Sequence, residues 1–185
     1  MSHHTINHSL SGEILEYTNV NSDRCYQCGK CSAGCPLAED MDYTSSMVMR
    51  MLQTEDPETE KELLKSKSIW LCVSCEMCIS RCPMSIDIPK VMDYLRQKSV
   101  ENGLQNKSAD KNIIAFHRSF LDMIKLTGRS YEPGMIVDYK LRSKTFFQDL
   151  TLAPKMFGRG KLSLFPERIK NRKNIRDIFK KSKKA

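Results

Sequence analysis

The stretch CYQCGKCSAGCP, residues 25–36, places four cysteines within eleven positions and ends on a proline. The same arrangement recurs once, as CVSCEMCISRCP over residues 72–83. Each run has two residues between its first three cysteines, three residues before the fourth, and proline next; the offset between the runs is 47 residues. All eight cysteines of the chain lie in these two runs, so the runs decide both its fold and its chemistry.

This spacing is typical of proteins that bind [4Fe–4S] clusters. A cubane cluster needs four thiolates at the corners of a tetrahedron, and two-residue spacers let three successive cysteines wrap one loop around it. In two-cluster ferredoxins, a run of this pattern gives its fourth cysteine to the other cluster. The sequence therefore predicts two [4Fe–4S] clusters. Cluster 1 is expected on Cys25, Cys28, Cys31 and Cys82, and cluster 2 on Cys72, Cys75, Cys78 and Cys35.

Zinc is the alternative metal. Zinc sites usually combine two Cys-x2-Cys pairs and do not require a third cysteine two residues later. The duplicated run with its repeated proline therefore favours iron–sulfur clusters. The function that would accompany zinc is a zinc-stabilised module that binds nucleic acid through the basic C-terminal residues.

The bulk composition indicates a reduced, intracellular setting. The chain has 185 residues and 21.3 kDa, and its cysteines are concentrated in two places, unlike those of a secreted disulfide scaffold. Its first residues contain no apolar core of the signal-peptide kind. No run approaches the ~20 apolar residues of a membrane helix. We expect a cytoplasmic protein without a membrane span.

The net charge of +8 is confined to one end of the chain. Residues 1–160 hold 20 basic and 20 acidic side chains, whereas residues 161–185 hold ten basic and two acidic ones. A basic terminal arm can bind nucleic acid, an anionic membrane or an acidic protein surface, and it can also be a solvated terminus that binds nothing. The charge alone therefore selects no partner.

Apolar periodicity predicts a mostly α protein. The helices are expected over residues 44–53, 56–64, 87–103, 108–127 and 167–181, with an irregular stretch over residues 129–166, where Pro and Gly recur. The predicted organisation is a lead-in (1–20), a helical core with both clusters (21–103), a packing helix of the same domain (104–130) and an extended, basic C-terminal arm for partner docking (131–185).

No other catalytic or cofactor-binding motif accompanies the cysteines. The sequence has neither a Gly-x-Gly-x-x-Gly dinucleotide loop nor a P-loop. Because the clusters would use every cysteine, no thiol remains as a nucleophile. We therefore expect an electron carrier with no catalytic residue of its own.

The long helical spacer between the runs resembles the α-helical ferredoxin domain of the iron–sulfur subunits of succinate dehydrogenase and fumarate reductase. A closer resemblance is to the C subunit of heterodisulfide reductase from methanogenic archaea. It rests on three stretches, which are CYQCGKCSAGCP, IWLCVSCEMCISRCPMSIDIPKVMDYLR and LAPKMFGRGKLSLFPERIK. This resemblance covers most of residues 10–170. The fold it implies is an α-helical ferredoxin domain with a helical, basic C-terminal extension.

The resemblance also implies a function and partners. Electrons would enter from the flavin-bearing A subunit, pass through both clusters and leave to the B subunit, which reduces the coenzyme M–coenzyme B heterodisulfide in methanogenesis. A hydrogenase or formate dehydrogenase would feed the larger complex, with flavin-based electron bifurcation. Nucleic acid is not an expected partner. The alternative is an iron–sulfur conduit subunit of another oxidoreductase, related to fumarate reductase or glycolate oxidase.

Overall fold

The regular elements of the computed structural model are helices. It describes residues 9–105, 111–145, 156, 158–159 and 169–182, and within them no strand occurs. The α-helices are α1 (Leu10–Thr18), α2 (Lys30–Ala33), α3 (Ser45–Thr54), α4 (Pro57–Lys65), α5 (Ser68–Leu71), α6 (Met77–Arg81), α7 (Ile88–Glu101), α8 (Lys111–Thr127), α9 (Glu132–Ser143) and α11 (Arg172–Ser182). Two short 3-10 helices lie at Ser22–Arg24 and Ala38–Asp40. The prediction of a mostly α fold is confirmed.

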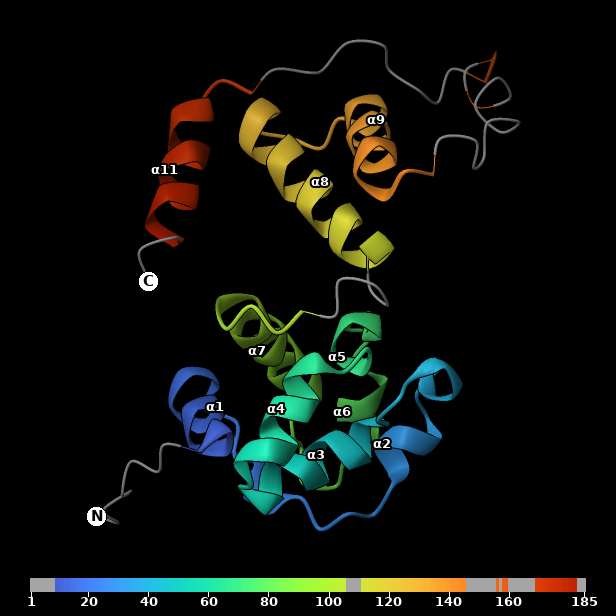
Figure 1. Cartoon of the computed structure of the whole chain (residues 1–185), viewed down its shortest axis with the longest axis vertical. Coiled ribbons are helices and arrows are strands. Elements are labelled where there is room, and N and C mark those ends of the chain that lie inside the picture. Colours follow the sequence, from blue (N-terminus) through green and yellow to red (C-terminus); the bar gives the residue numbers. More distant parts are fainter. Residues whose placement is uncertain (1–8, 106–110, 146–155, 157, 160–168, 183–185) are drawn as a thin grey trace. The chain divides into compact units, whose positions relative to one another are not determined.

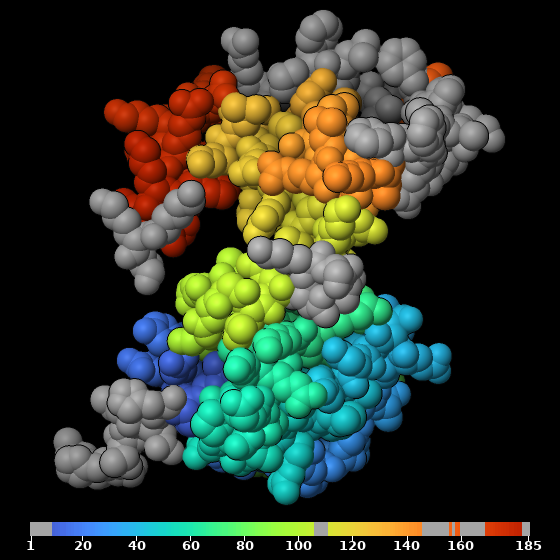
Figure 2. All heavy atoms as spheres, viewed as in Figure 1, coloured from blue at the N-terminus to red at the C-terminus, as the bar shows by residue number. Residues whose placement is uncertain are grey.

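The chain divides into two compact units, residues 1–110 and 111–185. The first unit contains both cysteine runs and is organised around α7, which contacts α1, α4, α5 and α6 (Figure 1). Figure 2 shows the atoms of residues 9–105 packed into one continuous body. Its core consists of fully buried apolar side chains at helical spacing, among them Ile14, Val48, Met49, Leu52, Leu63, Ile69, Val91, Met92 and Leu95.

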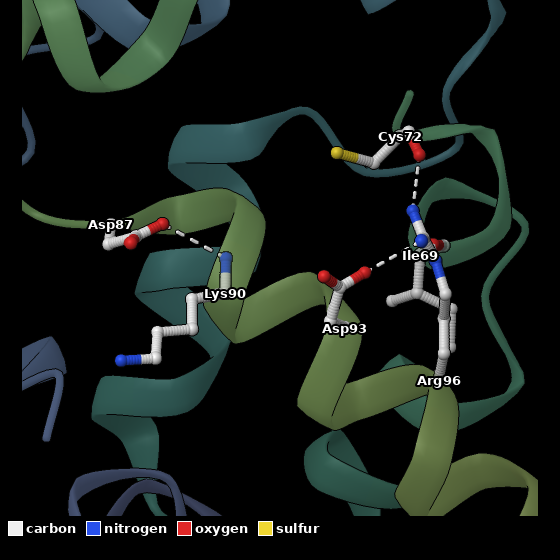
Figure 3. A network of polar contacts seen from close by, with 6 residues as sticks. All are labelled: Ile69, Cys72, Asp87, Lys90, Asp93 and Arg96. Atoms are coloured by element: carbon white, nitrogen blue, oxygen red, sulfur yellow. Dashed lines mark hydrogen bonds and ion pairs between the residues drawn. The ribbon is translucent and has the colours of Figure 1, made fainter. Parts of the chain in front are cut away.

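Local sequence explains why α7 begins where it does. Asp87 is the N-cap residue, and its side chain accepts a hydrogen bond of 3.1 Å from the backbone N–H of Lys90 (Figure 3). Pro89 stands in the first turn, where its missing N–H costs no hydrogen bond. Ile88, Val91 and Leu95 then follow at helical spacing and are buried. This helix is the support on which the second cysteine run rests.

Long-range polar contacts fasten the other helices to α7. The buried Ser99 hydroxyl donates to the carbonyl of Leu64 at 2.6 Å, which satisfies one free carbonyl at the end of α4. Glu13 of α1 accepts from the hydroxyl of Tyr94 at 2.9 Å and pairs with Lys98 at 2.6 Å. Helix α1 is therefore held to α7 by polar as well as apolar contacts.

In the second unit, α8 packs against both α9 and α11. Arg142 of α9 pairs with Asp122 of α8 and with Asp138 of its own helix, each at 2.7 Å. The rings of Phe116 and Tyr139 meet edge to face at 6.2 Å.

Among the described helices of the chain, none has both the length and the apolar character that crossing a membrane requires.

The expected helices over 44–53, 56–64, 87–103 and 108–127 are present as α3, α4, α7 and α8. The prediction of an irregular segment over 129–166 is wrong at Glu132–Ser143, which form α9; there Pro133 lies in the first turn, a position that tolerates proline. Of the helix expected over 167–181, residues 167–168 lie outside the described residues and residues 169–171 are not helical; the helix is α11, which begins at Arg172.

The grouping of the helices also differs from the expected organisation. That organisation places residues 104–130 in the cluster domain, whereas α8 packs with α9 and α11 in the second unit. Of the apolar side chains of α8, Ile114, Ala115 and Met123 are buried, whereas Phe116 and Phe120 stay partly exposed. Periodicity does not reveal which helices α8 contacts. At the other end of the chain, α1 lies within the expected lead-in (1–20) and packs against α3 and α7.

Candidate iron–sulfur centre

The two cysteine runs share an unusual backbone as well as a spacing. Gln27 and Ser74 occupy equivalent positions and have φ values of 61° and 52°. Gly29 and Glu76 are also equivalent, with φ values of 74° and 62°. Non-glycine residues adopt this left-handed conformation at a cost and hold it where the surrounding structure requires it. The runs therefore form the same loop twice.

A short helix follows each loop in the same way. Helix α2 contains Cys31 and helix α6 contains Cys78. The N–H of Cys35 donates to the carbonyl of Ser32 at 3.1 Å, and the N–H of Cys82 donates to that of the equivalent Ile79 at 3.0 Å. The chain thus reaches the fourth cysteine of each run through one tight turn. The proline that follows has no backbone N–H and cannot donate a further helical hydrogen bond.

Helices α2 and α6 are in contact, which brings the two runs together. At one point the contact is especially close, because the side chain of Arg81 lies directly over Gly34. A Cβ atom on Gly34 would overlap the guanidinium end of Arg81, so a larger residue there would make this exposed side chain move. Gly34 therefore leaves room for the Arg81 side chain to lie between the loops.

One group of cysteines lines a shared cavity. The lining contains Cys35 of the first run together with Cys72, Cys75 and Cys78 of the second. The remaining lining residues are mainly apolar and include Met41, Val73 and Ile88. The structure thus brings the four residues expected for cluster 2 around one apolar hollow, with the fourth cysteine crossing over from the other run.

For the cysteines expected on cluster 1, individual contacts show which of them lie near one another. Partial desolvation, and then the neighbouring thiols of Cys28, Cys82 and Cys25, raise the pKa of the Tyr26 phenol. Cys82 therefore lies close to the first run, although it follows α6 in the second. Its Sγ also accepts a hydrogen bond from the N–H of Ile86 at 3.4 Å. Such N–H groups stabilise thiolate charge and influence the reduction potential of a bound cluster.

Burial controls the acidity of the two helical cysteines. It raises the pKa of the Cys31 thiol, and it raises the pKa of Cys78 to about 11, with the Cys72 and Cys31 thiols adding to the effect at Cys78. A thiol of this kind is protonated at neutral pH unless a cation compensates the thiolate. Loading of iron on these residues would therefore release protons and contribute to folding.

The side chains do not converge on a single point. No group of three or more His, Cys, Asp or Glu side chains in the described part of the chain is arranged to hold one metal ion. A zinc ion would require four ligand atoms at about 2.0–2.3 Å from a common centre. In a cubane each thiolate binds a separate iron, so the four sulfurs stand further apart.

Two side chains outside the runs fix where each run begins, and the sequence analysis assigned neither of them a role. Gln53 of α3 donates from Nε2 to the carbonyl oxygen of Cys25 at 2.7 Å and to that of Ser22 at 3.0 Å. Arg96 of α7 donates from its guanidinium to the carbonyls of Cys72 and Ile69 and pairs with Asp93 at 2.8 Å (Figure 3).

These clamps hold backbone and leave the sulfurs free. In Figure 3 the Sγ of Cys72 points away from the Arg96 guanidinium that holds its carbonyl. Arg96 would have been hard to find from sequence, because an arginine on the polar side of a helix ordinarily predicts solvent contact. The one signal for Arg96 in the sequence is its place as the last residue of the stretch from Ile69 on which the resemblance partly rests.

Comparison with known proteins agrees with this geometry. Residues 21–86 match the family model of the 4Fe-4S dicluster domain. This match covers the spacer and both cysteine runs.

Three similar proteins are each named as the C subunit of a heterodisulfide reductase. The chain is 34% identical over 101 residues to that of ferredoxin:CoB-CoM heterodisulfide reductase of Methanosarcina acetivorans, covering 55% of this chain and 39% of the relative. It is 32% identical over 84 residues to the iron-sulfur C subunit of CoB--CoM heterodisulfide reductase of Methanopyrus kandleri, covering 45% and 42%. It is 27% identical over 95 residues to the C subunit of H(2):CoB-CoM heterodisulfide,ferredoxin reductase of Methanothermobacter marburgensis, covering 51% and 46%.

These alignments confirm the resemblance to the C subunit of heterodisulfide reductase. They extend over roughly half of the chain, which is less than the span of residues 10–170 expected from the three quoted stretches. The chain likewise matches less than half the length of each of these relatives.

The repeated left-handed position gives a matched pair of substitutions. Gly29→Ala adds a Cβ where no atom lies within 4 Å, so only the backbone conformation opposes it. We expect this variant to lose about 1 kcal/mol of stability, and Glu76→Gly to gain up to about that amount. Anaerobic thermal melting, followed by the visible absorbance of the clusters, measures both. Equal shifts of the same sign would contradict the equivalence of the two loops.

The Arg96 clamp predicts a local effect. Arg96→Met keeps the apolar stem and removes the donors, leaving two carbonyls unsatisfied at a cost of about 1–3 kcal/mol. We expect cluster 2, which depends on Cys72, to be lost on heating before cluster 1, as followed by the EPR signal of each. Asp93→Asn is the control, because the Asp93 side chain is 61% exposed and does not touch the run. The same loss in both variants would disprove the clamp.

Proposed function

We propose that the chain is an electron-transfer subunit of a heterodisulfide reductase and holds two [4Fe–4S] clusters. The observation that carries this proposal is the cavity lined by Cys35, Cys72, Cys75 and Cys78. A cysteine from one run stands there among three from the other, as the ligand exchange of two-cluster ferredoxins requires. The match of residues 21–86 to a dicluster domain and the names of the relatives support the same conclusion.

The residues that would hold each cluster follow from this exchange. Cluster 1 would take Cys25, Cys28, Cys31 and Cys82, and cluster 2 would take Cys72, Cys75, Cys78 and Cys35. When bound, such clusters supply reversible one-electron acceptor sites. The chain contributes N–H donors such as that of Ile86, apolar screening by Met41 and Ile88, and the Gln53 and Arg96 clamps.

The substrate chemistry belongs to partner chains in this proposal. Because the clusters would use all eight cysteines, this chain has no catalytic residue and would relay electrons from a flavin-bearing A subunit to a B subunit that reduces the coenzyme M–coenzyme B heterodisulfide. One similar protein is named as the C2 subunit of H(2)/formate:CoB-CoM heterodisulfide,ferredoxin reductase, of Methanococcus maripaludis, which supports a hydrogenase or formate dehydrogenase as the donor. The basic arm, including α11, would dock one of these partners.

A conduit subunit of another oxidoreductase would use the same cysteines. Identification of the chains that copurify under anaerobic conditions separates the two functions. A partner rich in Cys-Cys-Gly motifs supports the heterodisulfide reductase, and a flavin enzyme acting on dicarboxylates or glycolate would overturn it.

The ligand exchange predicts opposite effects for two serine substitutions. Cys28→Ser should damage cluster 1 and spare cluster 2, whereas Cys35→Ser should damage the cluster held by Cys72, Cys75 and Cys78. EPR spectra of the reduced variants measure both, because each cluster contributes its own signal. Although Cys28 and Cys35 belong to one run, the two signals should respond separately. If both substitutions altered one signal and left the other intact, the exchange would be wrong.

A further inference from the structure

The two loops expose residues at equivalent positions. Cys28 and Cys75, the second cysteine of each run, are both exposed. An apolar residue at equivalent positions stands beside each of them, with Tyr26 59% exposed and Val73 65% exposed. Each loop therefore offers a partner direct access to one cluster ligand.

The charges around these two cysteines are opposite. Residues 24–33, which we call the Cys28 loop, contain Arg24 and Lys30 and no acidic residue. The equivalent residues 71–80, the Cys75 loop, contain Glu76 and no basic residue. Arg24 and Lys30 are both exposed, and neither takes part in an ion pair within the described residues.

A polar hollow extends the Cys28 loop on one side. Its lining includes Arg24 together with Lys90 from α7, Asn19, Asn21 and Asp87. Asp87 caps α7 through its contact with the N–H of Lys90, so its carboxylate already has a partner. The hollow therefore places a second basic side chain and two amides beside Arg24, a lining suited to a carboxylate from another protein.

We propose that the Cys28 loop docks a protein redox partner with an acidic surface, and that the Cys75 loop does not. This inference rests on the proposed function, since it assigns a partner to cluster 1. Opposite charges raise the rate of encounter and orient the partner, and an exposed tyrosine supplies amphipathic contact area of the kind that anchors interfaces. Transient redox encounters bury little surface, below about 1,200 Å², so one loop and its hollow suffice.

The experiment uses the full chain with its clusters and a plant-type [2Fe–2S] ferredoxin of acidic surface as the probe. Stopped-flow absorbance measures the second-order rate at which the reduced ferredoxin reduces the chain at several salt concentrations. The test variant is Arg24→Gln/Lys30→Gln. The control is Lys61→Gln/Lys65→Gln, which removes the same charge from exposed positions of α4.

We expect the test variant to lose about tenfold in rate at low salt, the control to lose much less, and the difference to close as salt rises. Equal losses would overturn the proposal, because the rate would then follow net charge alone. If the test variant weakened binding of an RNA homopolymer and left ferredoxin reduction unchanged, the loop would contact nucleic acid and the proposal would also fail.

Iron content and both EPR signals are measured on every variant before the kinetics. A fully loaded variant with an unchanged rate contradicts the docking proposal and leaves the proposed function standing. A wild-type chain that takes up no clusters contradicts the proposed function. The docking proposal is then tested by ferredoxin binding alone, and it fails if the Arg24→Gln/Lys30→Gln variant binds ferredoxin as tightly as the wild type.

Discussion

The contact between α2 and α6 is the constraint on which the first unit depends. It carries the fourth cysteine of each run toward the first three cysteines of the other, so neither set of four exists unless the two helices pack. The side chain of Arg81, which ends α6, lies over Gly34, which follows α2, and so adds a side-chain contact to the packing of the two helices. A bound cluster would then act as a crosslink between segments 47 residues apart in the sequence.

Other helices of the unit support these loops through contacts with their backbone. Helix α7 supplies the buried stripe that supports the second run and the Arg96 side chain that holds its first carbonyl. Gln53 of α3 performs the equivalent task for the first run. Left-handed residues such as Ser74 and Glu76 keep their conformation because these contacts determine the backbone around them. Similar loops are thus stabilised by different side chains.

The sequence alone predicted the parts of this arrangement that depend on spacing. The cysteine offsets indicated clusters, and apolar periodicity at Met92 and Leu95 or at Val48 and Leu52 predicted buried helices. Contacts between distant residues could not be predicted in this way. Helix α9 was missed because Pro133 and Gly134 usually indicate a turn, and the neighbours of α8 could not be predicted because its apolar face does not identify what covers it. Arg96 and Gln53 depend on the folded path of the chain and have no local signature.

Metal analysis of the folded chain decides whether two cubane clusters join the duplicated loops. The protein is purified with oxygen excluded, and its iron, acid-labile sulfide and zinc are measured against protein concentration. Two clusters require about eight iron atoms and eight sulfides per chain, with no stoichiometric zinc. A folded, colourless protein that contains zinc in place of iron would contradict the account.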